Sequence, residues 1–222
     1  MWYIVLVVLF VLFLVTRSTY TSHVTCLSAD ETNQYLAKDP DGFVGSLNQW
    51  DLFARKVSSP QEYLDKISKS GITCDITYDM TSRVDNYFRS KGDSKIADMP
   101  WTIAMTDGTY EQGYPHTRQN IIFLSRNEID FETMVHEKLH VYQRYNPPDL
   151  AQMGFKYLRP RQGEYRLRSN PDISDGKIWE GFGKAMVAHY LTDRPMGLSD
   201  VDTEPQFEHP YEWISYNYTT TQ

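Results

Sequence analysis

The stretch FETMVHEKLHVYQRY at residues 131–145 contains the pattern HExxH, which begins at His136 and ends at His140. Asp130 precedes the stretch and is a residue type that caps helix N-termini, and two prolines after Asn146 favour a helix end there. The apolar residues in between recur every three or four positions, as in an amphipathic helix. At 3.6 residues per turn, both histidines lie on one face. The sequence therefore predicts a helix over these residues with two imidazoles beside its buried face.

Two imidazoles one helical turn apart can bind the same metal ion, and this spacing is typical of zinc sites. Glu137 stands beside them in the sequence. A carboxylate in that place can take a proton from a metal-activated water and pass it to a leaving amine. We therefore expect one Zn²⁺ per chain, with Glu137 as the general base.

A catalytic zinc ion usually has three protein ligands and one open position, so a third ligand should follow His140. No histidine stands six residues after His140, which excludes the metzincin arrangement. Glu212 is the preferred candidate, because Pro210 suits the first turn of a helix that would carry it. His209 and Glu180 stay open as alternatives. The two glycines that follow Glu180 are more typical of a strand or a bulge than of a helix.

Residues 28–99 are expected to form a mainly helical N-terminal subdomain. Pro60 is tolerated at the start of a helix, and Ser59 is a suitable cap. The alternating, β-branched stretch at residues 72–78 predicts a strand, followed by another helix. This half of the chain is expected to pack against the second half.

Residues 100–222 are expected to form the catalytic domain. Residues 101–106 and 119–125 are rich in apolar residues and predict two strands, separated by a polar loop with glycines at its turns. We expect these strands to form a hairpin that leads into the HExxH helix. Strands and helices in this order predict an α+β fold class.

The HExxH pattern followed by a distal helical glutamate resembles the gluzincin branch of zinc metallopeptidases. The resemblance covers residues 101–216 and implies a zincin-like catalytic domain with a mixed sheet, an active-site helix and a second ligand helix. Residues 114–118, 136–144 and 209–212 together are also similar to uncharacterised predicted peptidases of large DNA viruses and algae. The chain lacks the Asn-Glu-x-x-Ser-Asp string of thermolysin-like members, which leaves the identity of the third ligand open.

The resemblance implies a zinc ion held by His136, His140 and Glu212, with a peptide or protein as substrate. It also implies that the strand at residues 119–125 pairs with an extended substrate. Tyr216 and His116 are the candidate stabilisers of the transition state, because such sites need a donor near the attacked carbonyl.

Residues 2–15 read WYIVLVVLFVLFLV and are all apolar. A membrane-spanning helix needs about 20 such residues, and the core of a signal peptide needs about 7–15. A cleaved signal peptide normally has a basic residue before its apolar core, and no basic residue precedes this run. We expect residues 1–16 to be a hydrophobic anchor helix and residues 17–27 a linker, which makes the chain a single-pass membrane protein. A cleaved signal segment, which would make it secreted, and a buried helix are the alternatives.

The net charge of −7 and the pI near 5.3 exclude a nucleic-acid partner, which requires clustered lysine and arginine. The mean hydropathy of −0.53 excludes a polytopic membrane protein. Cys26 and Cys74 are the two cysteines, and the sequence leaves open whether they pair.

Three functions compete on these grounds. The first is a membrane-anchored zinc metallopeptidase. The second is a catalytically inactive zincin-like module that a metal staples together, for instance with His209 joining Glu212 as a fourth ligand. The third is a metal-free anchor protein in which the motif is accidental.

Overall fold

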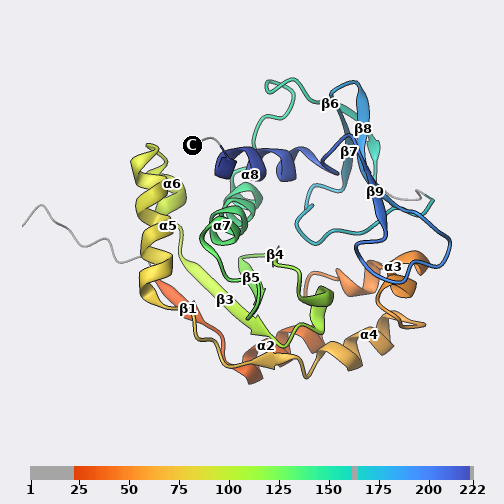
Figure 1. Cartoon of the computed structure of the whole chain (residues 1–222), viewed down its shortest axis with the longest axis horizontal. Helices are drawn as coiled ribbons and strands as arrows, with labels where there is room; N and C mark the ends of the chain where they lie inside the picture. The colour runs from red at the N-terminus through yellow and green to blue at the C-terminus, as the bar shows by residue number, and fades with distance from the viewer. Residues whose placement is uncertain (1–22, 162–164, 221–222) are drawn as a thin grey trace, which may run out of the picture.

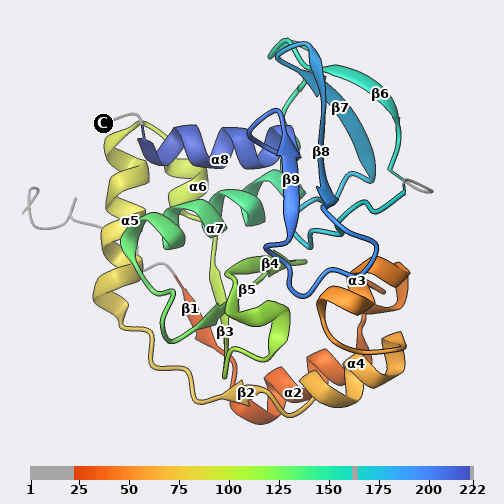
Figure 2. The same ribbon diagram turned by 45° about the vertical axis from the view of Figure 1, so that its right-hand side comes forward.

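The computed structural model describes residues 23–161 and 165–220. Within these residues the chain has an α+β fold with two sheets, one mixed and five-stranded and the other four-stranded (Figure 1). The mixed sheet lies among the helices of the first half, and the second sheet stands beside helix α8 (Figures 1 and 2). The α+β class and the mixed sheet are as expected from the sequence.

The first half of the described chain contains, in order, β1 (Val24–Cys26), α2 (Ala29–Lys38), η1 (Val44–Ser46), α3 (Gln49–Ala54), α4 (Pro60–Ile67), β2 (Gly71–Ile72), α5 (Tyr78–Ser90) and α6 (Ser94–Ala97). The second half contains β3 (Trp101–Thr106), η2 (Tyr110–Gly113), β4 (His116–Arg118), β5 (Ile121–Ser125), α7 (Phe131–Tyr145), β6 (Lys156–Pro160), β7 (Lys177–Gly181), β8 (Lys184–Tyr190), β9 (Val201–Glu204) and α8 (Pro210–Thr220). Strand β1 falls in the segment that we expected to be a linker.

The mixed sheet has the strand order β1-β3-β5-β4, and β2 pairs with the far end of β3. Strands β1, β3 and β5 are parallel, whereas β4 is antiparallel to β5. The expected hairpin between residues 101–106 and 119–125 is therefore wrong. In the sequence β4 stands between β3 and β5, and the hairpin forms between β4 and β5, whereas β3 and β5 pair in parallel. Gln119, with φ 54°, occupies the tight turn that joins them.

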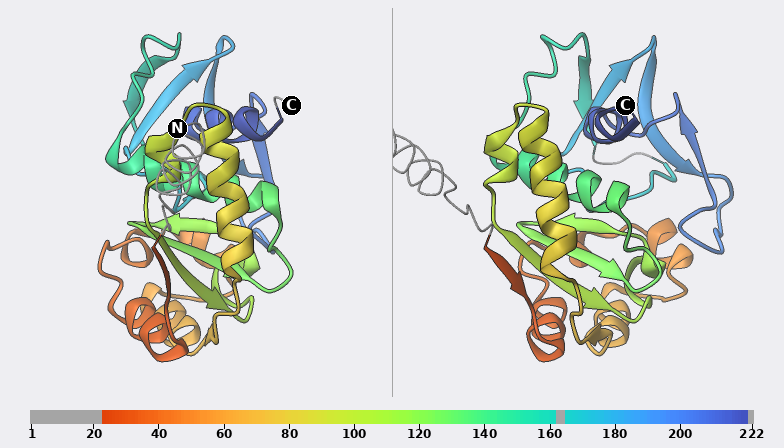
Figure 3. Two further views of the ribbon diagram at one scale, coloured as in Figure 1. Left: turned by 90° about the vertical axis from the view of Figure 1, so that its left-hand side faces the viewer. Right: turned by 60° about the vertical axis from the view of Figure 1, so that its left-hand side comes forward.

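The mixed sheet buries side chains on both faces, because successive residues of a strand point to opposite sides. On β5, Ile122 and Leu124 join a core formed with α5, α6 and α7. Ile121 and Phe123 join a second core on the other face, formed with α2 and α4. Figure 3 shows these helices on the two sides of the sheet. Residues 28–99 thus share both hydrophobic cores with the strands that lead to α7.

Helix α7 spans Phe131–Tyr145, as the sequence predicts, and the Asp130 side chain accepts a hydrogen bond from the backbone N–H of Thr133. Helix α8 begins at Pro210, also as predicted. The two helices lie side by side (Figure 2), and Gln143 of α7 contacts the first turns of α8. This pairing positions the site described below.

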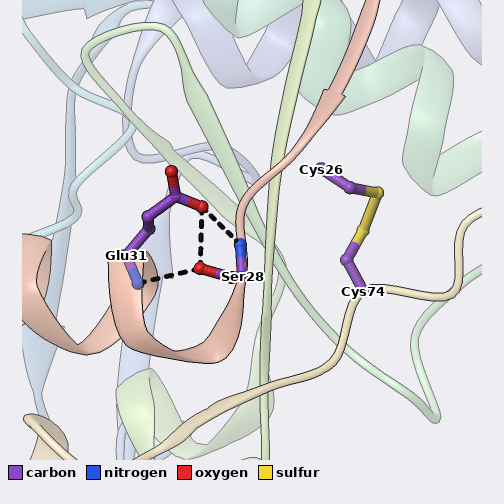
Figure 4. Close-up of a disulfide and its surroundings, with 4 residues drawn as sticks. All are labelled: Cys26, Ser28, Glu31 and Cys74. Carbon is purple, nitrogen blue, oxygen red and sulfur yellow. Dashed lines mark hydrogen bonds between the residues drawn. A yellow bond between two sulfur atoms is a disulfide. The ribbon is translucent and has the colours of Figure 1, made fainter.

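Cys26 and Cys74 form a disulfide that joins the end of β1 to the segment before α5 (Figure 4). Beside it, Ser28 and Glu31 form a capping box at the start of α2 (Figure 4). The strand expected at residues 72–78 is restricted to β2, which ends at Ile72. Strand β1 already occupies the edge of β3 beyond that point, so the chain after β2 has no strand to pair with.

The expected single-pass membrane localisation is corrected by the structure. No helix among residues 23–161 and 165–220 is both long enough and apolar enough to cross a bilayer. The anchor expected at residues 1–16 lies outside the described residues.

Candidate metal centre

Helices α7 and α8 bring three predicted ligand residues together. The Nε2 atoms of His136 and His140 are 2.9 Å apart, and they lie 3.3 Å and 3.5 Å from Oε2 of Glu212. A tetrahedral zinc ion with bonds of about 2.0–2.1 Å keeps its ligand atoms about 3.3 Å apart. The three measured separations bracket that value. The donor set, two imidazoles and one carboxylate, and its geometry therefore fit a single zinc ion.

A buried side chain fixes the orientation of the His140 ring. Nδ1 of His140 lies 2.9 Å from Oε1 of Gln143. Because an amide oxygen can only accept, Nδ1 carries a proton and Nε2 faces the centre, where its lone pair becomes the ligand once a metal displaces any proton on it. Nε2 of Gln143 in turn donates to the Tyr211 carbonyl and the Ser215 hydroxyl of α8, both at 3.4 Å. Gln143 thus joins the histidine helix to the glutamate helix.

The carboxylate of Glu212 is also held in place. Its Oε1 accepts a hydrogen bond of 2.9 Å from Nδ2 of Asn170, which leaves Oε2 facing the two histidines. Burial opposes ionisation of Glu212, but the neighbouring histidines outweigh it and hold its pKa well below the usual range. Burial likewise lowers the pKa of His140, but the charges of Glu212 and Asp172 overcome this and raise it to about 10. The acidic side chains around the centre therefore stabilise a positive charge placed there.

Glu137 lies beside the centre and is 3% exposed. Its Oε2 has no hydrogen-bond partner within the described part of the chain. Burial, and next the charge of Asp172, raises the pKa of Glu137 well above the usual range. A cavity of about 290 Å³ is lined by Glu137, His136 and Glu212 together. Glu137 thus lines the cavity with a buried side-chain oxygen that has no partner among the described residues.

The two alternative third ligands lie outside the cluster. His209 is fully buried, but its Nδ1 accepts from the backbone N–H of Tyr211 at 3.1 Å and its Nε2 contacts Asp175 at 3.1 Å. Both ring nitrogens therefore have partners, and Nδ1 caps the start of α8. Glu180 lies on β7 and faces Lys156, with 3.9 Å between Oε2 and Nζ. Neither residue joins the group that the structure brings together, which is His136, His140 and Glu212.

His116 lines the same cavity and is 3% exposed. Its Nδ1 lies 2.9 Å from the Tyr114 carbonyl, so Nδ1 carries the proton, and its Nε2 has no partner among the described residues. Burial lowers the pKa of His116, which favours the neutral ring. The neutral ring presents an acceptor to the cavity. The expected role as a donor to an oxyanion therefore does not match the hydrogen-bonding state of His116 in this structure.

Tyr216, the other candidate stabiliser, lies one turn after Glu212 on α8 and is 47% exposed. Its ring packs against Phe207, with 5.2 Å between the ring centroids. Phe207 lines the cavity. Tyr216 is therefore at the margin of the site.

The expectation that residues 119–125 pair with a substrate is wrong for strand β5, which lies between β3 and β4. The edge strand next to β5 is β4. Its Thr117 N–H donates to Asp172 at 2.6 Å, and its Thr117 carbonyl accepts from Arg144 at 2.7 Å. The backbone N–H and carbonyl of Thr117, which point away from β5, are therefore already bonded to side chains.

Sequence reasoning missed Gln143, Asn170 and Asp172. Gln143 could have been found, since it stands three residues after His140 and thus on the same helix face. Asn170 and Asp172 lie in an irregular segment and reach the site through contacts with residues more than forty positions away. No local pattern indicates such contacts.

The centre is assembled from side chains on two helices and on the segment that contains Asn170. Comparison of the chain with protein-family models, with curated proteins and with solved structures gave no match.

Proposed function

We propose that the protein is a zinc-dependent metallopeptidase that hydrolyses peptide bonds in a peptide or protein substrate. His136, His140 and Glu212 would hold one zinc ion, and Glu137 would be the general base. The observation that carries the proposal is the set of ligand-atom separations of 2.9, 3.3 and 3.5 Å beside a buried, unpartnered carboxylate oxygen. Each part alone is common in proteins, but together they form a His-His-Glu site with a base in reach.

The residues around the centre have separate tasks in this proposal. When bound, zinc supplies a Lewis acid that makes water a better nucleophile at neutral pH. Oε2 of Glu137 takes the proton of the attacking water and later passes it to the leaving nitrogen. Gln143 and Asn170 hold the rings and the carboxylate in the required orientation. Because Glu137 is buried, bulk water has little access to it.

We also propose that the fold is zincin-like. Three features of the structure support this. The sheet is mixed with an antiparallel edge strand, β4; α7 follows β5 directly; and α8 supplies the distal glutamate. These are the mixed sheet, active-site helix and second ligand helix that the resemblance implies.

The inactive, metal-stapled module has less support. A structural zinc site is typically closed by four protein ligands. Among the described residues the group contains three, and both ring nitrogens of His209 are engaged elsewhere. The cavity beside the three residues leaves space for a substrate group.

The test combines zinc analysis with cleavage of a peptide library by the wild type and by Glu137→Gln. Glutamine keeps the shape of the side chain but cannot accept the proton, so we expect one zinc per chain in both proteins and at least about a hundredfold loss of cleavage in the variant. Glu132→Gln is the matched control, because Glu132 is exposed on the first turn of the same helix. The proposal fails if the zinc-loaded wild type cleaves no peptide, or only peptides that Glu137→Gln cleaves as well.

A further inference from the structure

The carboxylate of Asp172 lies in the wall of the cavity beside the proposed centre. Asp172 is 6% exposed, and its Oδ1 accepts hydrogen bonds from Thr117, at 2.6 Å from the backbone nitrogen and 2.9 Å from Oγ1. Within the described residues, Oδ2 has no hydrogen bond, and Asp172 forms no ion pair within 4.0 Å. One oxygen is therefore fixed and the other is available.

The other acidic residues of the cavity already have partners or tasks. Glu111 pairs with Arg55, and Glu208 pairs with Arg168. Glu212 belongs to the proposed centre. On α7, Arg144 directs its Nη2 to the carbonyls of Thr117 and Pro171, at 2.7 and 2.6 Å, and to Oγ1 of Thr117, at 3.3 Å. Besides the proposed base Glu137, Asp172 is thus the carboxylate of this cavity that forms no salt bridge among the described residues.

A second, independent observation indicates what this wall binds. His116 lines the same cavity, and its Nε2 is buried and has no partner among the described residues. Because Nδ1 donates to the Tyr114 carbonyl, Nε2 of the neutral ring is an acceptor. A negative oxygen and a neutral acceptor nitrogen therefore line the cavity without a protein donor. Buried acceptors that lack a donor are costly, and a ligand with N–H groups would satisfy both.

We infer that Asp172 and His116 form a subsite for a positively charged nitrogen group of the substrate, next to the bond that is cut. The inference rests on the proposed function, because it names the class of substrate for that same cavity. The group can be the free α-ammonium of the substrate or the side chain of a lysine or arginine. Both sources present several N–H donors and a positive charge, which match one carboxylate and one imidazole nitrogen.

The test uses Asp172→Asn, which preserves the shape and an acceptor for Thr117 but removes the charge. Peptides that differ at one position next to the cleaved bond, with lysine, norleucine or glutamate there, separate the effect of charge from that of size. Each is prepared with a free and with an acetylated N-terminus, which separates the two sources of charge. Affinities are measured by calorimetry on zinc-loaded Glu137→Gln protein, and kcat/KM is measured with active Glu137.

In the presence of Asp172 we expect one cationic group, either lysine or the free N-terminus, to improve affinity and kcat/KM by about tenfold over the neutral peptide. Glutamate should weaken binding below the neutral peptide. Asp172→Asn should abolish this ranking. Asp149→Asn removes the same charge from an exposed position outside the cavity and should keep the ranking.

The outcomes separate the two proposals. Equal affinity and equal kcat/KM for cationic, neutral and acidic peptides would overturn the subsite while leaving the peptidase intact, and this test on the protein with native Asp172 does not depend on whether any Asp172 variant folds. A ranking that survives in Asp172→Asn would also overturn the subsite. Charge-dependent binding that requires Asp172, without cleavage of any peptide, would support the subsite and refute the peptidase.

Discussion

Replacing Gln143 with leucine should weaken zinc binding more than it weakens folding. Zinc needs the lone pair of His140 Nε2, which forces the proton onto Nδ1, and Oε1 of Gln143 accepts that proton at 2.9 Å. His140 is 1% exposed and Gln143 is 3% exposed, so water cannot replace the lost acceptor. Without metal, a His140 ring that lacks this acceptor can release its Nδ1 proton and keep the Nε2 proton, which Glu212 accepts at 3.5 Å. The penalty therefore falls mainly on the metal-bound state.

The magnitude follows from the unsatisfied donor. A buried N–H without a partner costs about 1–3 kcal/mol, and loss of such an outer contact typically lowers metal affinity about 10–100-fold. The hydrogen bonds from Gln143 to α8 are long, at 3.4 Å, and contribute less to the stability of the metal-free protein. We expect a 10–100-fold rise in the zinc Kd, by competition with a chelator of known affinity, and a smaller change in the unfolding free energy of the metal-free protein.

Two further variants make this test specific. Gln143→Glu keeps an acceptor for His140 Nδ1 and should bind zinc at least as tightly as the wild type. Gln61→Leu removes a glutamine from an exposed face of α4 and should have no effect. A Kd for Gln143→Leu within twofold of the wild-type value, or the same weakening in Gln143→Glu, would refute the reasoning.

The remaining predictions concern stability and are checked by urea denaturation of purified protein. Replacing Cys26 and Cys74 by serine opens a loop of 48 residues and should cost about 4 kcal/mol; a loss below about 1 kcal/mol would contradict this. Asp85→Leu leaves the fully buried ammonium of Lys138 without its carboxylate and should cost about 3–5 kcal/mol, whereas adding Lys138→Met should recover most of the loss; a double variant no better than the single one would be the contrary result. Asp130→Ala removes the cap of α7 and should cost about 1 kcal/mol, and an unchanged midpoint would show that the cap is dispensable.

The local elements of the site could be predicted from the sequence because their signals are local. Helix α7 has a cap, a helical repeat of apolar residues and a proline-bounded end, all within twenty positions. Helix α8 has a proline at its first position, which also places Glu212 in its first turn. Spacing along a helix then determines which side chains share a face.

Strand pairing could not be predicted in the same way. The apolar patterns of β3 and β5 indicate two strands, but alternation carries no information about direction. The strand that decides the topology, β4, has three residues, and all of them are polar and buried. Its Arg118 is held by Asp39 and Tyr110 through contacts that only the folded chain makes. A strand stabilised by such contacts has no pattern of its own.

The most direct test of the central claim is a crystal structure of the zinc-loaded protein with anomalous data at the zinc edge. We predict one zinc peak per chain, about 2 Å from Nε2 of His136, Nε2 of His140 and Oε2 of Glu212, with no fourth protein ligand. A zinc ion bound elsewhere, a site that uses His209, or a crystal grown with excess zinc that shows no peak at these residues would contradict the account.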